Sequence, residues 1–258
     1  RTQEKLMPET QTRLKIAGYT DTGRRRDYNQ DHIGFDQELG IAVLADGMGG
    51  HKAGEVAAHM AVKFVLDKLQ KFILQETYVS ITGSQLLEFV SNTISSSNTE
   101  IFHAQKEEEA YIGMGTTIVA TVVTDSQIYV GHVGDSRLYL YRNREVKRLT
   151  KDHSLVQDLI DRGFYTEREA RSANVRHVVT RAMGTKVDVD VDTAEVPLLP
   201  YDLLLLCSDG LTDMVSDWQI AETINENITD LDLAANKLVA LANQNGGKDN
   251  ISVILIKT

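Results

Sequence analysis

The stretch Ile41-Ala42-Val43-Leu44-Ala45-Asp46-Gly47-Met48-Gly49-Gly50-His51 joins an apolar, strand-like run to an aspartate and a glycine-rich turn. A carboxylate at the end of a buried strand would lose its hydration, and an unpaired buried charge is costly. The glycines beside it allow another group to approach the backbone closely. We therefore expect a positive group at Asp46. A hard metal ion is the natural candidate because such ions take oxygen ligands from carboxylates and carbonyls.

Composition limits the classes of protein that this chain can represent. Its 258 residues suit one large domain or two small ones, and 42% apolar with 25% charged residues is typical of globular proteins. The formal net charge of -10 argues against nucleic-acid or anionic-membrane partners. Cys207 is the single cysteine, which excludes an intramolecular disulfide and fits a reducing compartment. We expect a cytoplasmic monomer that binds neither membranes nor nucleic acids.

The patterns along the chain indicate one folded unit. Residues 1–12 are polar and start without Met, and we expect a disordered or artificial N-terminal segment there. Residues 13–258 contain no internal repeat, low-complexity linker or proline-rich hinge, so we expect a single domain. Within it, residues 151–174 carry many charges at helical spacing between strand-like segments, which is typical of a mobile surface insertion.

Hydrophobic periodicity predicts strands separated by pairs of helices. Strands are predicted at 14–20, 33–35, 41–45, 116–123, 127–133, 138–141, 203–207 and 251–256. Helices are predicted at about 54–72, 84–105, 217–227 and 232–243. Strand sections interrupted by helix pairs, rather than strict alternation, favour antiparallel sheets with helices packed outside. The predicted fold class is therefore α+β.

Four aspartates lie next to the ends of predicted strands. They are Asp46, Asp135, Asp209 and Asp249. Carboxylates about 4 Å apart repel by roughly 4 kcal/mol per pair at an effective dielectric near 20, so a cluster of them needs cations. Without soft ligands nearby, those cations would be magnesium or manganese. The alternative is that each aspartate is a turn residue, because Asp-Gly and Asp-Asn are common turn dipeptides.

Five motifs in the order and spacing of a known family decide between these interpretations. They are Asn29-Gln30-Asp31, the stretch 46–51, Gly134-Asp135-Ser136-Arg137, Ser208-Asp209-Gly210 and Gly247-Lys248-Asp249-Asn250. The chain resembles the metal-dependent protein phosphatases, the PP2C-like (PPM) serine/threonine phosphatase family, in its compact bacterial branch. The resemblance covers residues 16–257. One such motif alone is weak, whereas five in order are specific.

The resemblance implies a four-layer α-β-β-α sandwich, in which two antiparallel sheets are flanked by helix pairs. It also implies a catalytic centre of two manganese or magnesium ions at one end. Asp46 corresponds to the carboxylate that bridges both ions, and the Gly47 carbonyl to a ligand of the second ion. Asp209 and Asp249 correspond to ligands of the first ion.

Further residues take supporting roles by the same resemblance. Asp31 corresponds to a carboxylate that holds metal-bound waters, and Asp135 to a ligand of a third metal that it shares with Asp209. Arg26 corresponds to the arginine that grips the substrate phosphate, and a guanidinium offers phosphate a planar fork that lysine lacks. The segment 151–174 matches the family's flap, which we expect to be mobile and to govern substrate choice.

The function implied is hydrolysis of phosphoserine and phosphothreonine in proteins by direct attack of a metal-bridging water or hydroxide. Two positions depart from the family pattern. Gln30 replaces a glutamate found in many eukaryotic relatives, and Met48 replaces a histidine proposed as general acid. His51 is the nearest replacement for that acid, or else it binds substrate. Two alternatives stay open: a phosphoprotein-binding regulator with a silent site, and a phosphatase for small phosphoesters.

Several other sequence features could suggest a different catalytic or binding site, but each has a simpler structural interpretation. Cys207 lacks the arginine of a Cys-x5-Arg phosphatase loop, because Asp213 stands there, and it is expected to be a buried strand residue. The alternating Asp188, Asp190 and Asp192 are expected on an exposed strand face. His132 and His153 are expected to be structural residues rather than metal ligands. Trp218 is expected to pack at the start of a helix.

Overall fold

Two antiparallel β-sheets lie face to face in the computed structural model, which describes residues 14–50, 53–75, 81–170, 173–175 and 177–258. The first sheet has the order β1 (Lys15–Asp21), β11 (Ile251–Lys257), β10 (Leu203–Cys207), β7 (Arg137–Arg142) and β8 (Glu145–Arg148). The second has the order β2 (Asp31–Asp36), β3 (Ile41–Met48), β5 (Ile118–Val123), β6 (Gln127–Val133) and β9 (Asp192–Pro197), with β4 (Gly115–Thr116) beside the end of β3. The N-terminal segment 1–12 and His51 lie outside the described residues.

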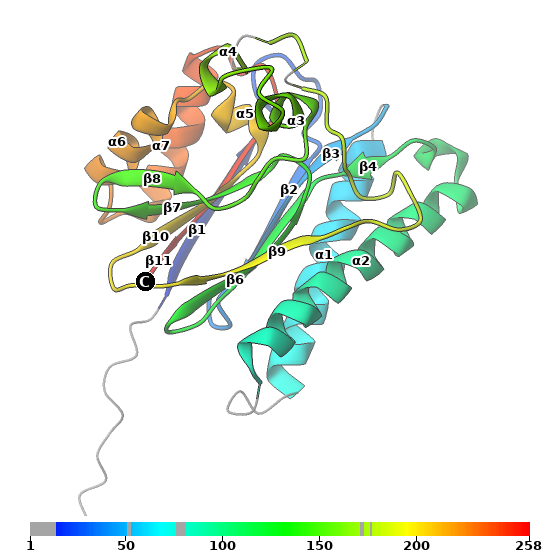
Figure 1. The fold of residues 1–258 in the computed structure, drawn as a ribbon, viewed down its shortest axis with the longest axis horizontal. Coiled ribbons are helices and arrows are strands. Elements are labelled where there is room, and N and C mark those ends of the chain that lie inside the picture. Colours follow the sequence, from blue (N-terminus) through cyan, green and yellow to red (C-terminus); the bar gives the residue numbers. More distant parts are fainter. Residues whose placement is uncertain (1–13, 51–52, 76–80, 171–172, 176) are drawn as a thin grey trace, which may run out of the picture.

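Helices cover the outer face of each sheet, so the predicted four-layer α-β-β-α sandwich is confirmed (Figure 1). α1 (Ala53–Gln75) and α2 (Gly83–Glu107) pack on the second sheet, and α6 (Asp217–Glu226) and α7 (Leu231–Gln244) pack on the first. The short elements η1 (Glu109–Tyr111), α3 (Leu155–Asp161), α4 (Glu167–Ala170) and α5 (Asp209–Thr212) complete the described part. No helix in that part combines the length and apolar character needed to cross a membrane.

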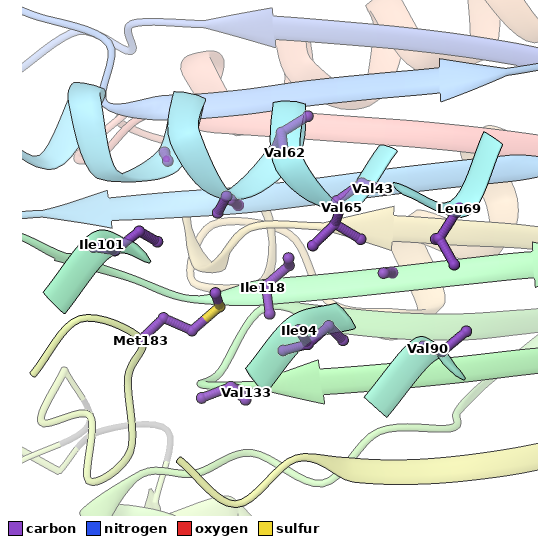
Figure 2. Close-up of a cluster of buried hydrophobic side chains, with 14 of the residues drawn as sticks. Val43, Val62, Val65, Leu69, Val90, Ile94, Ile101, Ile118, Val133 and Met183 are labelled. Carbon is purple, nitrogen blue, oxygen red and sulfur yellow. The ribbon is translucent and has the colours of Figure 1, made fainter. Parts of the chain in front are cut away.

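The alternating direction of side chains along each strand explains why continuous apolar runs stay buried. In β3, Ile41 and Val43 face the helix pair, whereas Ala42 and Leu44 face the other sheet. Successive side chains of a strand point to opposite faces, so a strand covered on both faces is apolar throughout. Figure 2 shows the outer core of the second sheet, with Val62, Val65 and Leu69 of α1 and Val90, Ile94 and Ile101 of α2 over Val43, Ile118 and Val133.

The same rule applies to the first sheet. Leu203, Leu205 and Cys207 of β10 pack in the core beneath α6 and α7. Leu204 and Leu206 pack in the core between the sheets. Cys207 is fully buried, as expected of a strand residue without a reactive role.

Strand register brings distant chain segments to one edge of the sandwich. Asp31 lies directly opposite Asp46 in the β2–β3 pair. The end of β10 pairs with the start of β7, and it also lies beside the start of β11. The turns before β7, after β10 and before β11 therefore meet at the edge where β3 ends.

The structure differs from the predicted elements in a few places. β8 was not predicted as a strand, because it is a short edge strand with charged, exposed positions. The exposed strand expected at Asp188, Asp190 and Asp192 is the edge strand β9, which starts later than expected. Asp192 begins the exposed strand β9, whereas Asp188 and Asp190 precede it. In the described part of segment 151–174, the helical spacing corresponds to two short helices, α3 and α4. Trp218 is 71% exposed, so the prediction that it packs at a helix start was wrong.

Candidate metal centre and phosphate site

A pocket of about 600 Å³ opens at the edge where these strands end. It is bordered by the site residues predicted from the sequence, namely Arg26, Asp46, Gly47, Asp135, Asp209 and Asp249. Asp31 lies behind Asp46 and is buried. The structure thus brings together every predicted site residue that it describes, and His51 alone falls outside the described residues.

Asp46 is held by its backbone, which leaves the carboxylate to face the pocket. Its N–H donates to Thr117 Oγ1 at 3.0 Å, and its carbonyl accepts from the Thr117 N–H and from Thr116 Oγ1, both at 2.9 Å. The side chain keeps part of its surface open to the pocket, yet protein surrounds it on most sides. Burial, followed by repulsion from Asp31 and Asp209, raises the pKa of Asp46 well above its usual range.

Asp209 approaches the start of β11 because its neighbour is a glycine. A Cβ at Gly210 would overlap the carbonyl of Asn250, so the close approach requires glycine here. Burial raises the pKa of Asp209 well above its usual range, and the charges of Asp135 and Asp249 raise it further. Its Oδ1 atom is buried and has no hydrogen-bond partner among the described residues.

Asp31 and Asp135 are the two other buried carboxylates of this edge. Asp31 accepts a hydrogen bond from Ser208 Oγ at 2.7 Å, while its Oδ1 has no partner in the described part of the chain. Burial raises the pKa of Asp31 to about 6. Burial, with repulsion from Asp152, likewise raises the pKa of Asp135 to about 6. Neither group is stabilised as an anion by this protein alone.

This donor set fits divalent cations that prefer oxygen. The carboxylates are buried, mutually repulsive and incompletely hydrogen-bonded, and the backbone of Gly47 borders the same pocket. A bound cation would reverse the sign of these interactions, because each carboxylate then gains an opposite charge. Carboxylate and carbonyl oxygens favour magnesium or manganese over softer metals.

Two further side chains lie beside Asp209 and were missed by sequence reasoning. His177, Asp209 and Asp213 each offer one ligand atom, and these atoms lie within 4.8 Å of one another. His177 Nδ1 is 3.3 Å from Asp213 Oδ2. His177 comes from a distant segment that only the fold brings to Asp209. Asp213 lies one helical turn after Asp209, at the end of α5, and no sequence motif assigned it a ligand role.

Arg26 is a cationic side chain at the rim of the pocket, which Lys248 also borders. Its Nη2 donates to Asp249 Oδ2 at 2.6 Å, and half of the side chain is exposed. That hydrogen bond, together with the Asp249 charge, raises the pKa of Arg26, so it stays charged. A guanidinium in this position can turn from the carboxylate to an incoming phosphate.

Asn250 positions the loop that carries Arg26. Its Nδ2 donates to the carbonyls of Thr22 and Tyr28, both at 2.9 Å. Its Oδ1 accepts from the Gln30 N–H at 2.8 Å. The sequence placed Asn250 inside a motif without giving it a role, because a hydrogen bond to a distant backbone leaves no local signal.

The structure shows what surrounds Gln30 and Met48, the two residues that depart from the family pattern. The Gln30 side chain donates from Nε2 to the carbonyl of Gly49 at 3.3 Å, so its amide contacts the glycine turn. Met48 borders the pocket. Neither side chain contributes a charge to the carboxylate edge.

Two stacked histidines hold the turn that carries Asp135. His132 and His153 lie 4.7 Å apart between ring centroids. The Gly134 N–H donates to His153 Nδ1 at 3.0 Å, and the His153 N–H donates to the Gly134 carbonyl at 2.9 Å. His132 Nε2 is 2.8 Å from the Lys151 carbonyl. Both are buried, and together with Asp192 they offer ligand atoms within 4.8 Å of one another, so their purely structural role stays a prediction.

A second pocket of about 430 Å³ adjoins the first. Both are bordered by Asp135, Asp209, Asp213 and Met214. Its outer wall comes from the segment 151–174 and includes Val156, Gln157 and Ile160 of α3 and Glu167 and Ala170 of α4. α3, α4 and α5 lie together at this end of the sandwich (Figure 1).

The raised pKa values predict how stability depends on pH when no metal is bound. Asp31 and Asp135 titrate near pH 6 in the folded chain and near 3.9 when unfolded. The contribution of each protonated carboxyl to the free energy of unfolding is therefore complete below about pH 4 and is lost as pH rises through 6. The loss is on the order of 2 to 3 kcal/mol for each group. We expect urea unfolding in chelator to show that Asp135→Asn stabilises the chain at pH 7.5 but not at pH 4.

Manganese supplies the matching control for this prediction. At pH 7.5 the ion should stabilise the wild-type chain against urea more than it stabilises Asp135→Asn. An Asp135→Asn variant whose stability relative to wild type is the same at pH 4 and pH 7.5 would contradict the prediction.

Comparisons with known proteins agree with this geometry. The family model described as Protein phosphatase 2C matches residues 21–243. The chain is 39% identical over 241 residues to the serine/threonine phosphatase stp of Listeria monocytogenes, covering 92% of this chain and 93% of that protein.

Solved structures give the same result. The serine/threonine phosphatase PstP/Ppp of Mycobacterium tuberculosis is 34% identical, with a TM-score of 0.85 over 95% of this chain and 98% of that chain. The catalytic domain of PstP in complex with 2 manganese ions is 33% identical, with a TM-score of 0.81 over 95% and 97% of the two chains. From its motifs, its sandwich fold and these relatives, the chain belongs to the protein phosphatase 2C family.

Proposed function

We propose that this chain is a metal-dependent serine/threonine phosphatase that hydrolyses phosphoserine and phosphothreonine in proteins. The observation that carries the proposal is the convergence of Asp46, Asp135, Asp209 and Asp249 on one pocket, with Arg26 at its rim. A cluster of buried carboxylates destabilises a fold unless cations bind there, and a neighbouring guanidinium suits a phosphate substrate. The relatives named as serine/threonine phosphatases support the same conclusion.

In this proposal the cofactor is Mn²⁺ or Mg²⁺, with two core ions and a possible third. Asp46 and the Gly47 carbonyl would hold the core ions together with Asp209 and Asp249. Asp31 would hold waters of that centre, and Asp135 would be a ligand of the third ion together with Asp209. When bound, such ions lower the pKa of a water molecule and offset the negative charge of the phosphate.

Substrate binding, orientation and proton donation depend on side chains of the protein. Arg26 releases Asp249 and binds two phosphate oxygens, which orients the phosphate for in-line displacement. Asn250 fixes the position of the Arg26 loop relative to the carboxylates through its three hydrogen bonds. We assign His51 as the donor of the proton to the leaving group, since Met48 at the pocket has no proton to give.

The segment 151–174 is proposed to be a mobile flap that governs substrate choice. It forms the outer wall of the second pocket, which adjoins the carboxylate edge. A phosphopeptide bound at Arg26 would extend past this wall, whereas a small phosphoester would not reach it. The flap is therefore placed to affect peptide turnover selectively.

The partners in this proposal are phosphorylated proteins. We also propose that residues 13–258 act as a single domain, and that the chain works as a cytoplasmic monomer without membrane or nucleic-acid partners. The net charge of -10 supports the absence of nucleic-acid partners, and the single buried Cys207 suits a reducing compartment.

Removing metal or one central carboxylate tests the proposed chemistry. We expect hydrolysis of p-nitrophenyl phosphate and of a phosphothreonine peptide in Mn²⁺, and its loss in chelator. Asp46→Asn keeps the shape of the side chain but removes its charge, so turnover should fall by at least about a hundredfold. Asp67→Asn, at an exposed position of α1, is the matched control and should keep full activity.

The same assay separates this proposal from its alternatives. Turnover that survives chelation or Asp46→Asn would refute metal-dependent hydrolysis at this centre. Peptide binding without turnover in saturating Mn²⁺ would favour a regulator with a silent site. Turnover of small phosphoesters far above that of peptides would assign a different substrate class.

Arg26 is expected to act on the substrate rather than on folding. Arg26→Lys should lower kcat/KM for the phosphothreonine peptide by roughly 10- to 100-fold, because an ammonium cannot bind two oxygens as a planar fork. Arg25→Ala, at the exposed neighbouring position, should leave kcat/KM unchanged. Equal effects of the two substitutions would remove Arg26 from the phosphate site.

A charge reversal in the flap tests its proposed role. Glu167→Lys changes a side chain that borders the second pocket. We expect it to change the ratio of peptide to p-nitrophenyl phosphate turnover several-fold while p-nitrophenyl phosphate turnover stays constant. Glu88→Lys, on an exposed position of α2, is the control. An unchanged ratio in Glu167→Lys, measured with peptides of different charge, would contradict the flap proposal.

A further inference from the structure

Two histidines from separate elements meet outside the carboxylate pocket. His32 lies on β2 and His59 on α1. His32 Nε2 and His59 Nδ1 share a hydrogen bond of 3.3 Å, and the rings form a T-shaped pair with centroids 4.6 Å apart. His32 is half-buried and His59 is exposed, so solvent reaches the pair.

The fold explains why these side chains meet. On β2, Asp31 and Ile33 face the other sheet, since Asp31 bonds Ser208 and Ile33 packs in the core between the sheets. His32 therefore points the other way, toward α1. Two residues later on the same face, a Cβ at Gly34 would press against Val62 of α1. The helix consequently lies close over this strand.

The separation of the two nitrogens suits a shared metal ion. Zinc binds imidazole nitrogen at about 2.0–2.1 Å with tetrahedral angles, which places two such nitrogens about 3.3–3.4 Å apart. Glu55 stands one turn before His59 on α1, and residues four apart lie on the same helix face. It is near enough to His32 for their charges to interact. Its carboxylate does not lie within 4.8 Å of both nitrogens, so it would have to turn toward them to serve as an oxygen ligand.

We propose that His32, His59 and Glu55 form a second metal site, separate from the carboxylate centre, that takes Zn²⁺ or a similar imidazole-binding ion. Imidazole nitrogens favour zinc, cobalt and nickel, whereas the carboxylate edge favours magnesium and manganese. The two sites therefore differ in the metal they select, and this inference does not depend on the proposed catalytic activity.

The position of the site gives it a structural consequence. Glu55 and His59 lie in the first two turns of α1, and the backbone of Gly54 packs against Gly47 at the carboxylate edge. An ion bound to His32 and His59 ties these turns to β2. It stabilises the packing behind the carboxylate pocket without contacting the substrate.

Zinc binding in the presence of excess magnesium tests the site. Saturating Mg²⁺ occupies the carboxylate centre, and equilibrium dialysis against ZnCl₂ then counts the zinc ions bound per chain. We expect wild type to bind one zinc ion more than His59→Ala, and Glu55→Gln to weaken that binding at least about tenfold. His103→Ala, at an exposed histidine of α2, should bind zinc as wild type does.

A second probe reports the ligands directly. Co²⁺ bound in place of Zn²⁺ should give the absorption bands of a four-coordinate ion in wild type, and these bands should disappear in His59→Ala. His177→Ala is included because His177 offers an exposed imidazole near the carboxylates of Asp209 and Asp213. Zinc binding that persists in His59→Ala, or that is lost in His177→Ala instead, would overturn the proposal.

Discussion

Repulsion among buried carboxylates is the constraint on which this structure depends. Asp31, Asp46, Asp135 and Asp209 come from segments far apart in the chain, and burial raises the pKa of each of them. Their convergence opposes folding, because a carboxylate in a desolvated cluster lacks compensating charge. The scaffold must therefore hold them together until cations bind, and that requirement explains much of the surrounding architecture.

The sandwich meets this requirement with three apolar cores. One core lies between the sheets, and one lies beneath each pair of helices. Strands such as β3 and β10 are buried on both faces, so their register is strongly specified and a slip of one residue would turn every side chain to the wrong face. Because the strand ends are fixed in this way, the acidic side chains attached to them have little freedom to separate.

Hydrogen bonds from uncharged side chains hold the charged groups of the site in place. Thr116 and Thr117 hold the backbone of Asp46, Ser208 binds Asp31, and Asn250 joins the Arg26 loop to β11. These groups orient the charged side chains without neutralising them. The carboxylates consequently stay available to cations, and Arg26 stays available to a phosphate.

The sequence by itself determined the fold class, the alternating helix pairs and strands, and the aspartates at strand ends, because periodicity and strand-terminal residues are local properties. The ordered motifs also identified the family. Edge strand β8, the position of His177 beside Asp209, and the meeting of His32 with His59 follow only from the tertiary structure. Their physical reason is shared: each depends on contacts between segments distant in the chain, and such contacts leave no periodic or compositional signal in either segment alone.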